Sequence, residues 1–82
     1  MDRPEPHVRQ LEQARAALAE AEQAILDGEM RILEQRLGLE ALWAGGHDTM
    51  EAEQILGDLL DSLAARKARR DEVLRVIRAL QA

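Results

Sequence analysis

Two adjacent glycines, Gly45-Gly46, interrupt a helical pattern that otherwise runs unbroken from about residue 7 to about residue 80. They lie close to the midpoint of the 82 residues, and glycine takes the left-handed conformation that ends a helix without steric cost. Asp48 or Thr49 then begins a second helix. Asp48 and Glu51 have the spacing of a capping box, which satisfies free N–H groups of the first turn. The predicted turn, residues 45–48, consists of Gly45, Gly46, His47 and Asp48.

The first predicted helix, about residues 7–44, repeats an apolar side chain every seven positions. This repeat consists of Leu11, Leu18, Ile25, Ile32 and Leu39. A second set follows three positions later and consists of Ala14, Ala21, Gly28, Gln35 and Leu42. Such heptads are typical of a helix that packs along another helix. The small members of the second set would let a neighbouring helix approach closely.

The second predicted helix, about residues 49–80, carries a matching line of residues spaced alternately by four and three. This line consists of Ala52, Leu56, Leu59, Leu63, Arg66, Arg70, Val73, Ile77 and Leu80. Because the turn is short, the helices should fold back antiparallel, with Leu39 near Leu56 and Leu18 near Leu74 to Ile77. The fold class is therefore all-α, an antiparallel two-helix coiled-coil hairpin.

Both helices also carry apolar residues away from this line. On the first helix they are Leu26, Met30, Leu33, Leu37 and Ala41, and on the second Ile55, Leu60 and Leu74. At about 100° per residue, the first group lies roughly 140° round the helix from the main repeat. One partner helix cannot cover both sides, so we expect a homodimer that forms a four-helix bundle through these second stripes.

Composition restricts the possible partners. The net charge is −5, which argues against general affinity for nucleic acid or anionic membranes. No apolar run approaches the roughly 18 residues of a membrane span, and there is no cysteine for a disulfide or thiolate metal site. Residues 1–6 contain two prolines and are expected to form a disordered arm without a signal peptide. We expect a soluble, cytoplasmic protein.

The only concentrated positive charge is the run that contains Arg66, Lys67, Arg69 and Arg70. One interpretation is a nucleic-acid contact, as in basic-region helices. The other is pairing with acids of the first helix, since Arg66 and Arg70 should fall beside Asp27 and Glu22. The second is favoured, because Asp71 follows directly and no nearby aromatic residue is available for base stacking.

The remaining polar residues form no catalytic or metal-binding pattern. His7 and His47 fall at opposite ends of the predicted hairpin, and Ser62 has no histidine within predicted reach. No Glu-x-x-His or His-x-x-x-His spacing occurs. The sequence therefore predicts no enzyme, cofactor or metal site. Trp43 is expected to pack over the turn against Ile55 or Met50, or else to anchor a partner.

The middle of the chain resembles a group of small bacterial proteins, common in alphaproteobacteria, that form helical hairpins around a Gly-His/Asp-Thr turn. The residues that carry this resemblance are Gly28-Glu29, Ile32, Gln35, Leu39 and Leu42, then Gly46-His47-Asp48-Thr49, Ala52-Glu53 and Leu56. The resemblance covers about residues 22–63. It implies a hairpin fold and a bacterial origin, and it implies no activity.

Two functions are compatible with these features. The first is a non-enzymatic protein–protein interaction module, a small coiled-coil adaptor or regulator whose apolar helix faces bind itself or another helical protein. The alternative is a nucleic-acid-associated regulator that uses the basic run Arg66 to Arg70.

Overall fold

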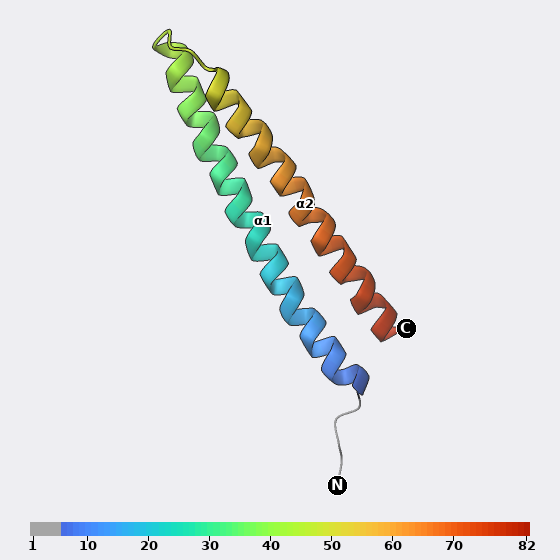
Figure 1. Ribbon diagram of the computed structural model, residues 1–82. Helices are drawn as coiled ribbons and strands as arrows, with labels where there is room; N and C mark the ends of the chain where they lie inside the picture. Colours follow the sequence, from blue (N-terminus) through green and yellow to red (C-terminus); the bar gives the residue numbers. More distant parts are fainter. Residues whose placement is uncertain (1–5) are drawn as a thin grey trace.

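The computed structural model describes residues 6–82, and the predicted arm lies outside this range except for Pro6, which begins the first helix. Helix α1 spans Pro6–Ala44 and helix α2 spans Met50–Gln81. The described residues contain no strand. The two helices run antiparallel and contact each other, with the turn at one end and the start of α1 and the end of α2 toward the other (Figure 1). The predicted all-α hairpin is confirmed at this level.

The hairpin is a rod. Its principal extents are 70 × 18 × 14 Å and its radius of gyration is 19.1 Å, whereas a compact domain of this length would have a radius of gyration of about 12 Å. Two helices side by side touch along one line and cannot enclose a core. Even the most buried of the described apolar side chains, Leu39, keeps 4% of its surface exposed.

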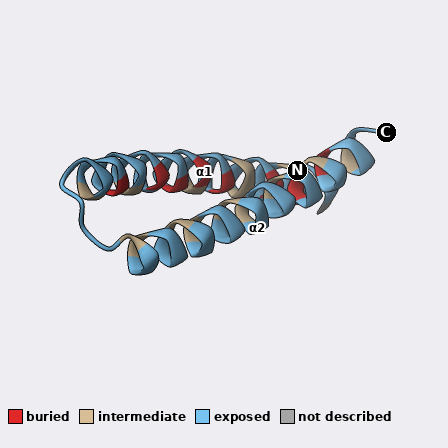
Figure 2. Cartoon of the chain, turned by 90° about the horizontal axis from the view of Figure 1, so that it is seen from above, coloured by how far each residue is buried: buried red, intermediate tan, exposed pale blue. Residues whose placement is uncertain are grey.

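Buried residues follow the line along which α1 and α2 touch, here called the seam (Figure 2). All five members of the seven-residue repeat of α1 are buried or half-buried, and the small residues Ala14, Ala21 and Gly28 are buried. On α2 the seam consists of the predicted line, in which Val73 and Ile77 are buried and the others are half-buried. Ala14, Val73 and Ile77 form a cluster against which Leu11, Ala17, Leu18 and Leu80 pack.

The end of α1 is closed by a Schellman motif. Gly46 has a φ of 72°, in the left-handed region. The N–H of His47 donates to the carbonyl of Leu42 at 2.9 Å, and that of Gly46 to the carbonyl of Trp43 at 3.0 Å. These two bonds satisfy carbonyls that the helix end would leave open. Of the two glycines, Gly46 is therefore the one that the turn requires.

The start of α2 differs from the expected capping box. The helix begins at Met50 with Thr49 as its N-cap residue, and Thr49 makes no side-chain cap bond. Instead, the Met50 N–H donates to Oδ1 of Asp48 at 3.0 Å, and the Thr49 hydroxyl donates to Oε1 of Glu53 at 3.2 Å. The predicted pairing of Asp48 with Glu51 is wrong, because Asp48 lies one position before the cap and bonds the N–H two residues on.

Candidate interaction surface

The outer side of α1 carries an uncovered apolar strip. Its members, here called the α1 strip, are Leu26, Met30, Leu33 and Leu37, and they are 50 to 57% exposed. Leu26 and Met30 follow the seam residue Ile25 by one and five positions, which places them roughly 100° and 140° round the helix. The strip therefore lies on the side of α1 away from the seam, and α2 leaves at least half of the surface of each of its residues exposed.

The first half of α2 extends this apolar surface beside the strip. Leu33 and Leu60 line the same groove, about 240 Å³ in volume, together with Glu29, Ile32, Arg36 and Leu63. Leu60 is 41% exposed. The groove places one strip residue and one α2 residue on a common long face of the hairpin.

The other predicted interface residues do not join this face. Ile55 is exposed, but it precedes the seam residue Leu56 by one position, whereas Leu60 follows Leu59 by one. These two positions flank the seam on opposite sides. Leu74 follows the seam residue Val73 by one position and so lies on the same flank as Leu60, but it is half-buried and lies two heptads further along α2. Ala41 is exposed but small. The predicted set therefore divides into a continuous strip on α1 with Leu60 beside it, and separate residues elsewhere.

A second groove lies between the first part of α1 and the last part of α2. It has a volume of about 520 Å³ and is lined by Gln10, Gln13, Ala14, Ala17, Arg69, Glu72, Val73, Val76 and Leu80. Val76, which is 51% exposed, is absent from the residues singled out by sequence. The sequence could have indicated it, because Val76 lies three residues after the seam residue Val73, at a position beside the seam but not on it.

Two polar side chains of the seam each bond the backbone of the opposite helix. Gln35 of α1 donates through Nε2 to the Ala52 carbonyl of α2 at 3.1 Å. Arg66 of α2 donates through Nη1 to the Ala24 carbonyl of α1. Because each bond joins a side chain to one particular backbone carbonyl, together they hold the helices in register.

Gly28 makes room for the Arg66 bond. A Cβ at Gly28 would lie 3.3 Å from Arg66 Nη1 and 3.3 Å from Leu63 Cδ1. The guanidinium thus crosses α1 where a side chain is missing. Side chains of α2, Arg66 and Leu63, fill the space at Gly28, and the closer approach of the two helices expected from the small residues stays a prediction.

The expected ion pairs between the helices do not form. Arg66 bonds a carbonyl, and Arg70 pairs with its neighbour Asp71, with both Nε and Nη2 at 3.1 Å from Oδ1. Asp27 accepts a hydrogen bond from Gln23 at 3.1 Å. The long arginine side chains reach closer acceptors than the acids across the seam, so the predicted pairing with Asp27 and Glu22 is wrong.

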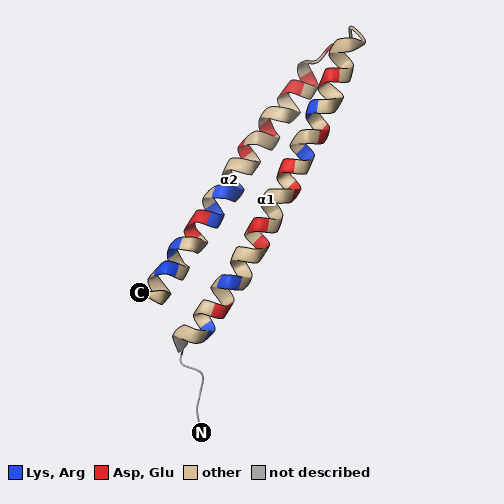
Figure 3. Cartoon of the chain, turned by 180° about the vertical axis from the view of Figure 1, so that it is seen from behind, with Lys and Arg blue, Asp and Glu red and all other residues tan. Residues whose placement is uncertain are grey.

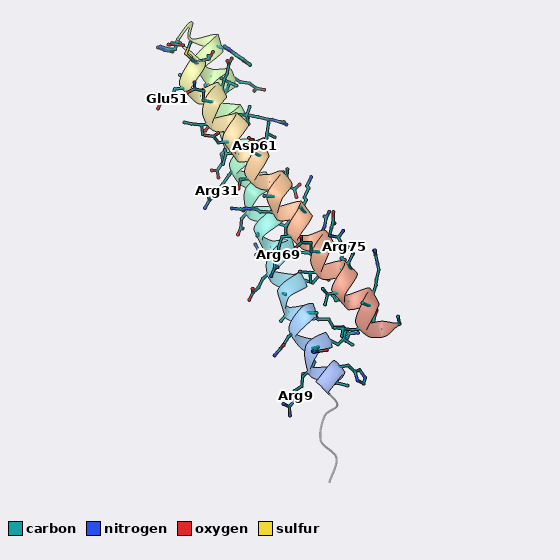
Figure 4. All side chains as sticks on the ribbon, turned by 45° about the vertical axis from the view of Figure 1, so that its right-hand side comes forward. Arg9, Arg31, Glu51, Asp61, Arg69 and Arg75 are labelled. Atoms are coloured by element: carbon teal, nitrogen blue, oxygen red, sulfur yellow. The ribbon has the colours of Figure 1, made fainter. Side chains whose placement is uncertain are left out.

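The basic run does not present one surface. Arg66 and Arg70 are half-buried and bonded, while Lys67 and Arg69 are exposed. Lys67 follows a seam residue and Arg69 precedes one, so they flank the seam on opposite sides. The second half of α2 is nonetheless rich in positive charge and the first half in negative charge (Figure 3). Arg69 and Arg75 lie on different sides of α2 (Figure 4).

Trp43 is bound to the turn by one hydrogen bond. Its Nε1 donates to the Thr49 hydroxyl at 3.2 Å, which in turn donates to Glu53. The indole ties the end of α1 to the start of α2, and more than half of its surface stays exposed. Met50 and Ile55, against which it was expected to pack, are exposed as well.

The residues with catalytic or ligand chemistry are far apart. His7 lies in the first turn of α1 and His47 in the interhelical turn, at opposite ends of the rod, with Ser62 in the middle of α2. The His47 ring lies over Gly45, where a Cβ would be 2.7 Å from its Cδ2. Across residues 6–82, no three histidine, aspartate or glutamate side chains converge in a way that could hold a metal ion.

No protein-family model, curated protein or solved structure matches this chain. The resemblance to bacterial hairpin proteins stays a prediction. Neither α1 nor α2, as described, contains a stretch that is long and apolar enough to cross a membrane.

Proposed function

We propose that this chain is a protein–protein interaction module, an adaptor or regulator that acts through an apolar helix face, and that its first partner is a second copy of itself. The observation that supports this proposal most strongly is the exposure of the α1 strip, whose four large side chains lie in a row with half or more of their surface uncovered. Single exposed leucines are ordinary on a protein surface, but a contiguous row marks a contact surface.

The limited burial within one hairpin supports the same proposal. None of the described side chains is fully buried, and a chain of this size with a single line of contact gains little stability from its own packing. Association of two hairpins would form a four-helix assembly and bury a second line of apolar contacts. The helices themselves would need no rearrangement.

The energy available from the strip matches a reversible contact. Covering the exposed half of a leucine-class side chain contributes about 1–1.5 kcal/mol. Eight such side chains, four from each copy, contribute roughly 10 kcal/mol, against an association cost of about 4–15 kcal/mol. The lowest of these costs leaves about 6 kcal/mol, which corresponds to a dissociation constant of tens of micromolar. We therefore expect a reversible dimer that could exchange its copy for another helical protein.

Substitution within the strip tests the proposal. Leu33→Glu places a charge at the centre of the strip, and Val76→Glu places the same charge on an equally exposed valine of α2 outside it. Sedimentation velocity should show a monomer for the first variant and the wild-type dimer for the second. Circular dichroism should show helix in both. A Leu33→Glu protein that is as dimeric as the wild type would show that the two copies do not associate through the α1 strip.

Nucleic-acid binding through the basic run has less support. Two of its four charges are bonded within the hairpin, and the other two flank the seam on opposite sides. A gel-shift titration with DNA and RNA at low salt separates the two functions, because electrostatic binding is strongest there. A salt-dependent shift lost in Lys67→Ala/Arg69→Ala would favour the nucleic-acid function over the interaction module.

A further inference from the structure

The charges beside the α1 strip carry information about how a partner would lie on it. Glu29 and Arg36 flank the strip on one side, seven residues apart, and Arg31 and Glu34 lie on the other. All four side chains are exposed, and none has a hydrogen bond or ion pair to another described residue. In Figure 4, Arg31 projects outward from the hairpin.

These charges become complementary when α1 packs antiparallel on a copy of itself. A two-fold axis perpendicular to α1 between residues 32 and 33 places opposite each other those residues whose numbers add to 65. Glu29 then faces the copy's Arg36, and Arg31 faces the copy's Glu34. The two-fold axis also requires the same flank of both helices to meet, which is the condition for each contact to form twice.

The apolar strip is centred close to the same axis. The numbers of Leu26 and Leu37, and of Met30 and Leu33, add to 63 rather than 65, so each of these pairs is offset by two residues, about 3 Å along the helix, and its members still come into contact. A parallel two-fold arrangement would instead bring opposite flanks of the two helices together and place Glu29 beside the copy's Glu34, five positions further on, which is unfavourable.

We infer that two copies associate through α1 against α1, antiparallel, about a two-fold axis beside Leu33, with Glu29 and Arg36 of each copy paired with Arg36 and Glu29 of the other. In this arrangement the α2 helices lie on the outside, because the strip points away from α2. The inference depends on the proposed function, since it names the geometry of the self-association proposed there.

Charge reversal tests the pairing directly. Glu29→Arg places four arginines at the two contacts, and Arg36→Glu places four glutamates there. Each variant alone should dimerise at least tenfold more weakly than the wild type, because attraction becomes repulsion at both symmetric contacts. An equimolar mixture of the two should form a heterodimer of wild-type affinity, and the double variant Glu29→Arg/Arg36→Glu should regain the homodimer. Glu20→Arg is the control, because it makes the same charge change outside the strip.

Engineered cysteines test the position of the axis. The chain contains no cysteine, so each substitution provides a single thiol. Leu33→Cys should form a disulfide-linked dimer under mild oxidation. Leu26→Cys and Leu37→Cys should not cross-link alone, because each would lie roughly 13 Å or more from its own copy, estimated at 1.5 Å per residue. A mixture of Leu26→Cys and Leu37→Cys should cross-link.

The outcomes separate this inference from the proposed function. If the wild-type dimer is lost in Leu33→Glu but is insensitive to both charge reversals, the antiparallel pairing is overturned. Association through the α1 strip is then still supported. Cross-linking of Leu26→Cys with itself indicates a parallel arrangement and overturns the inference. A wild-type chain that stays monomeric overturns the self-association on which both depend. Rescue in the mixture, with Glu20→Arg behaving as wild type, supports the pairing.

Discussion

Three glycines, two in α1 and one in the turn, lie in different surroundings. Replacing each of them should therefore change the free energy of unfolding by a different amount. Gly46 has a positive φ, Gly28 lies under Arg66, and Gly38 has no heavy atom within 4 Å of its Cβ position. The same substitution, glycine to alanine, therefore probes backbone strain, steric crowding and helix propensity in turn.

Gly46→Ala should lower the free energy of unfolding by about 1–2 kcal/mol, because an L-residue is strained in the left-handed region. Gly38→Ala should raise it by about 0.5–1 kcal/mol, because alanine restricts the unfolded chain and favours helix. Urea unfolding followed by circular dichroism, at one protein concentration, measures both. Equal effects of the two substitutions would show that the Schellman motif does not limit the turn.

Gly28→Ala tests whether the hairpin needs the space that the missing side chain leaves for Arg66. The new methyl group would lie 3.3 Å from both Arg66 and Leu63, so the crowding should offset the gain in helix propensity. Gly57→Ala is the matched control, since its Cβ meets nothing within 4 Å. We expect Gly28→Ala to be less stable than Gly57→Ala by about 1–2 kcal/mol in the same urea assay. A Gly28→Ala protein as stable as Gly57→Ala would mean that Arg66 moves aside without loss.

At the scale of the helices, α1 and α2 are aligned by contacts that combine apolar packing with two bonds from side chain to backbone. The apolar repeat alone permits sliding by one heptad, because each heptad resembles the next. Gln35 and Arg66 each bond one carbonyl of the opposite helix, and a shift of the helices would break both bonds. The charges of α2 stabilise this helix by itself. Glu51 and Glu53 lie in its first turn and Arg78 in its last, which complements the helix dipole.

Arg66→Ala should reduce the free energy of unfolding by about 1–2 kcal/mol, because it removes a charged hydrogen bond and the packing of the arginine stem. Lys67→Ala, one position along at an exposed residue without a bond to the other helix, should change it by less than about 0.5 kcal/mol. Thermal unfolding of both variants under identical conditions gives the comparison. If Arg66→Ala unfolds at the wild-type temperature, its bond to Ala24 does not stabilise the hairpin.

The seam was predictable from spacing, and the bonds across it were not. Apolar residues at every seventh position identify the buried side of a helix, so Leu11 to Leu39 and Leu56 to Ile77 were placed correctly on the seam. The partner of Arg66 depended on the space over Gly28 and the reach of a flexible side chain, which spacing does not describe. The same limit applies to the start of α2, where Glu53 rather than Glu51 bonds the cap residue. The exposed strip was also predictable from the sequence. Ile55 and Leu60, however, were predicted to belong to one interface, and they lie on opposite sides of the seam.

At the scale of the whole molecule, a rod of two helices leaves much of its apolar surface outside. The side of α1 away from α2 carries four large apolar residues in a row, and among residues 6–82 neither α2 nor the turn covers them. In the proposed function, association supplies what a third or fourth helix supplies in a single-chain bundle. The stability of the fold and the proposed contact are thus linked through concentration.

This linkage gives a prediction for heating experiments. A dimer that unfolds to two chains gains stability with concentration, so the midpoint of thermal unfolding should rise as the protein is concentrated. Circular dichroism at a series of concentrations measures it. Leu33→Glu, which should be monomeric, provides the control, because its midpoint should not change. A wild-type midpoint that is equally independent of concentration would indicate that the hairpin unfolds alone.

The most direct test of the account is the mass of the wild-type protein in solution. Sedimentation equilibrium from about 1 to about 100 µM brackets the expected dissociation constant. The account predicts a mass that rises from that of one chain, 9.2 kDa, toward twice that value over this range. A mass that stays at 9.2 kDa at every concentration, with full helix content, would show that the α1 strip stays uncovered and would contradict the account.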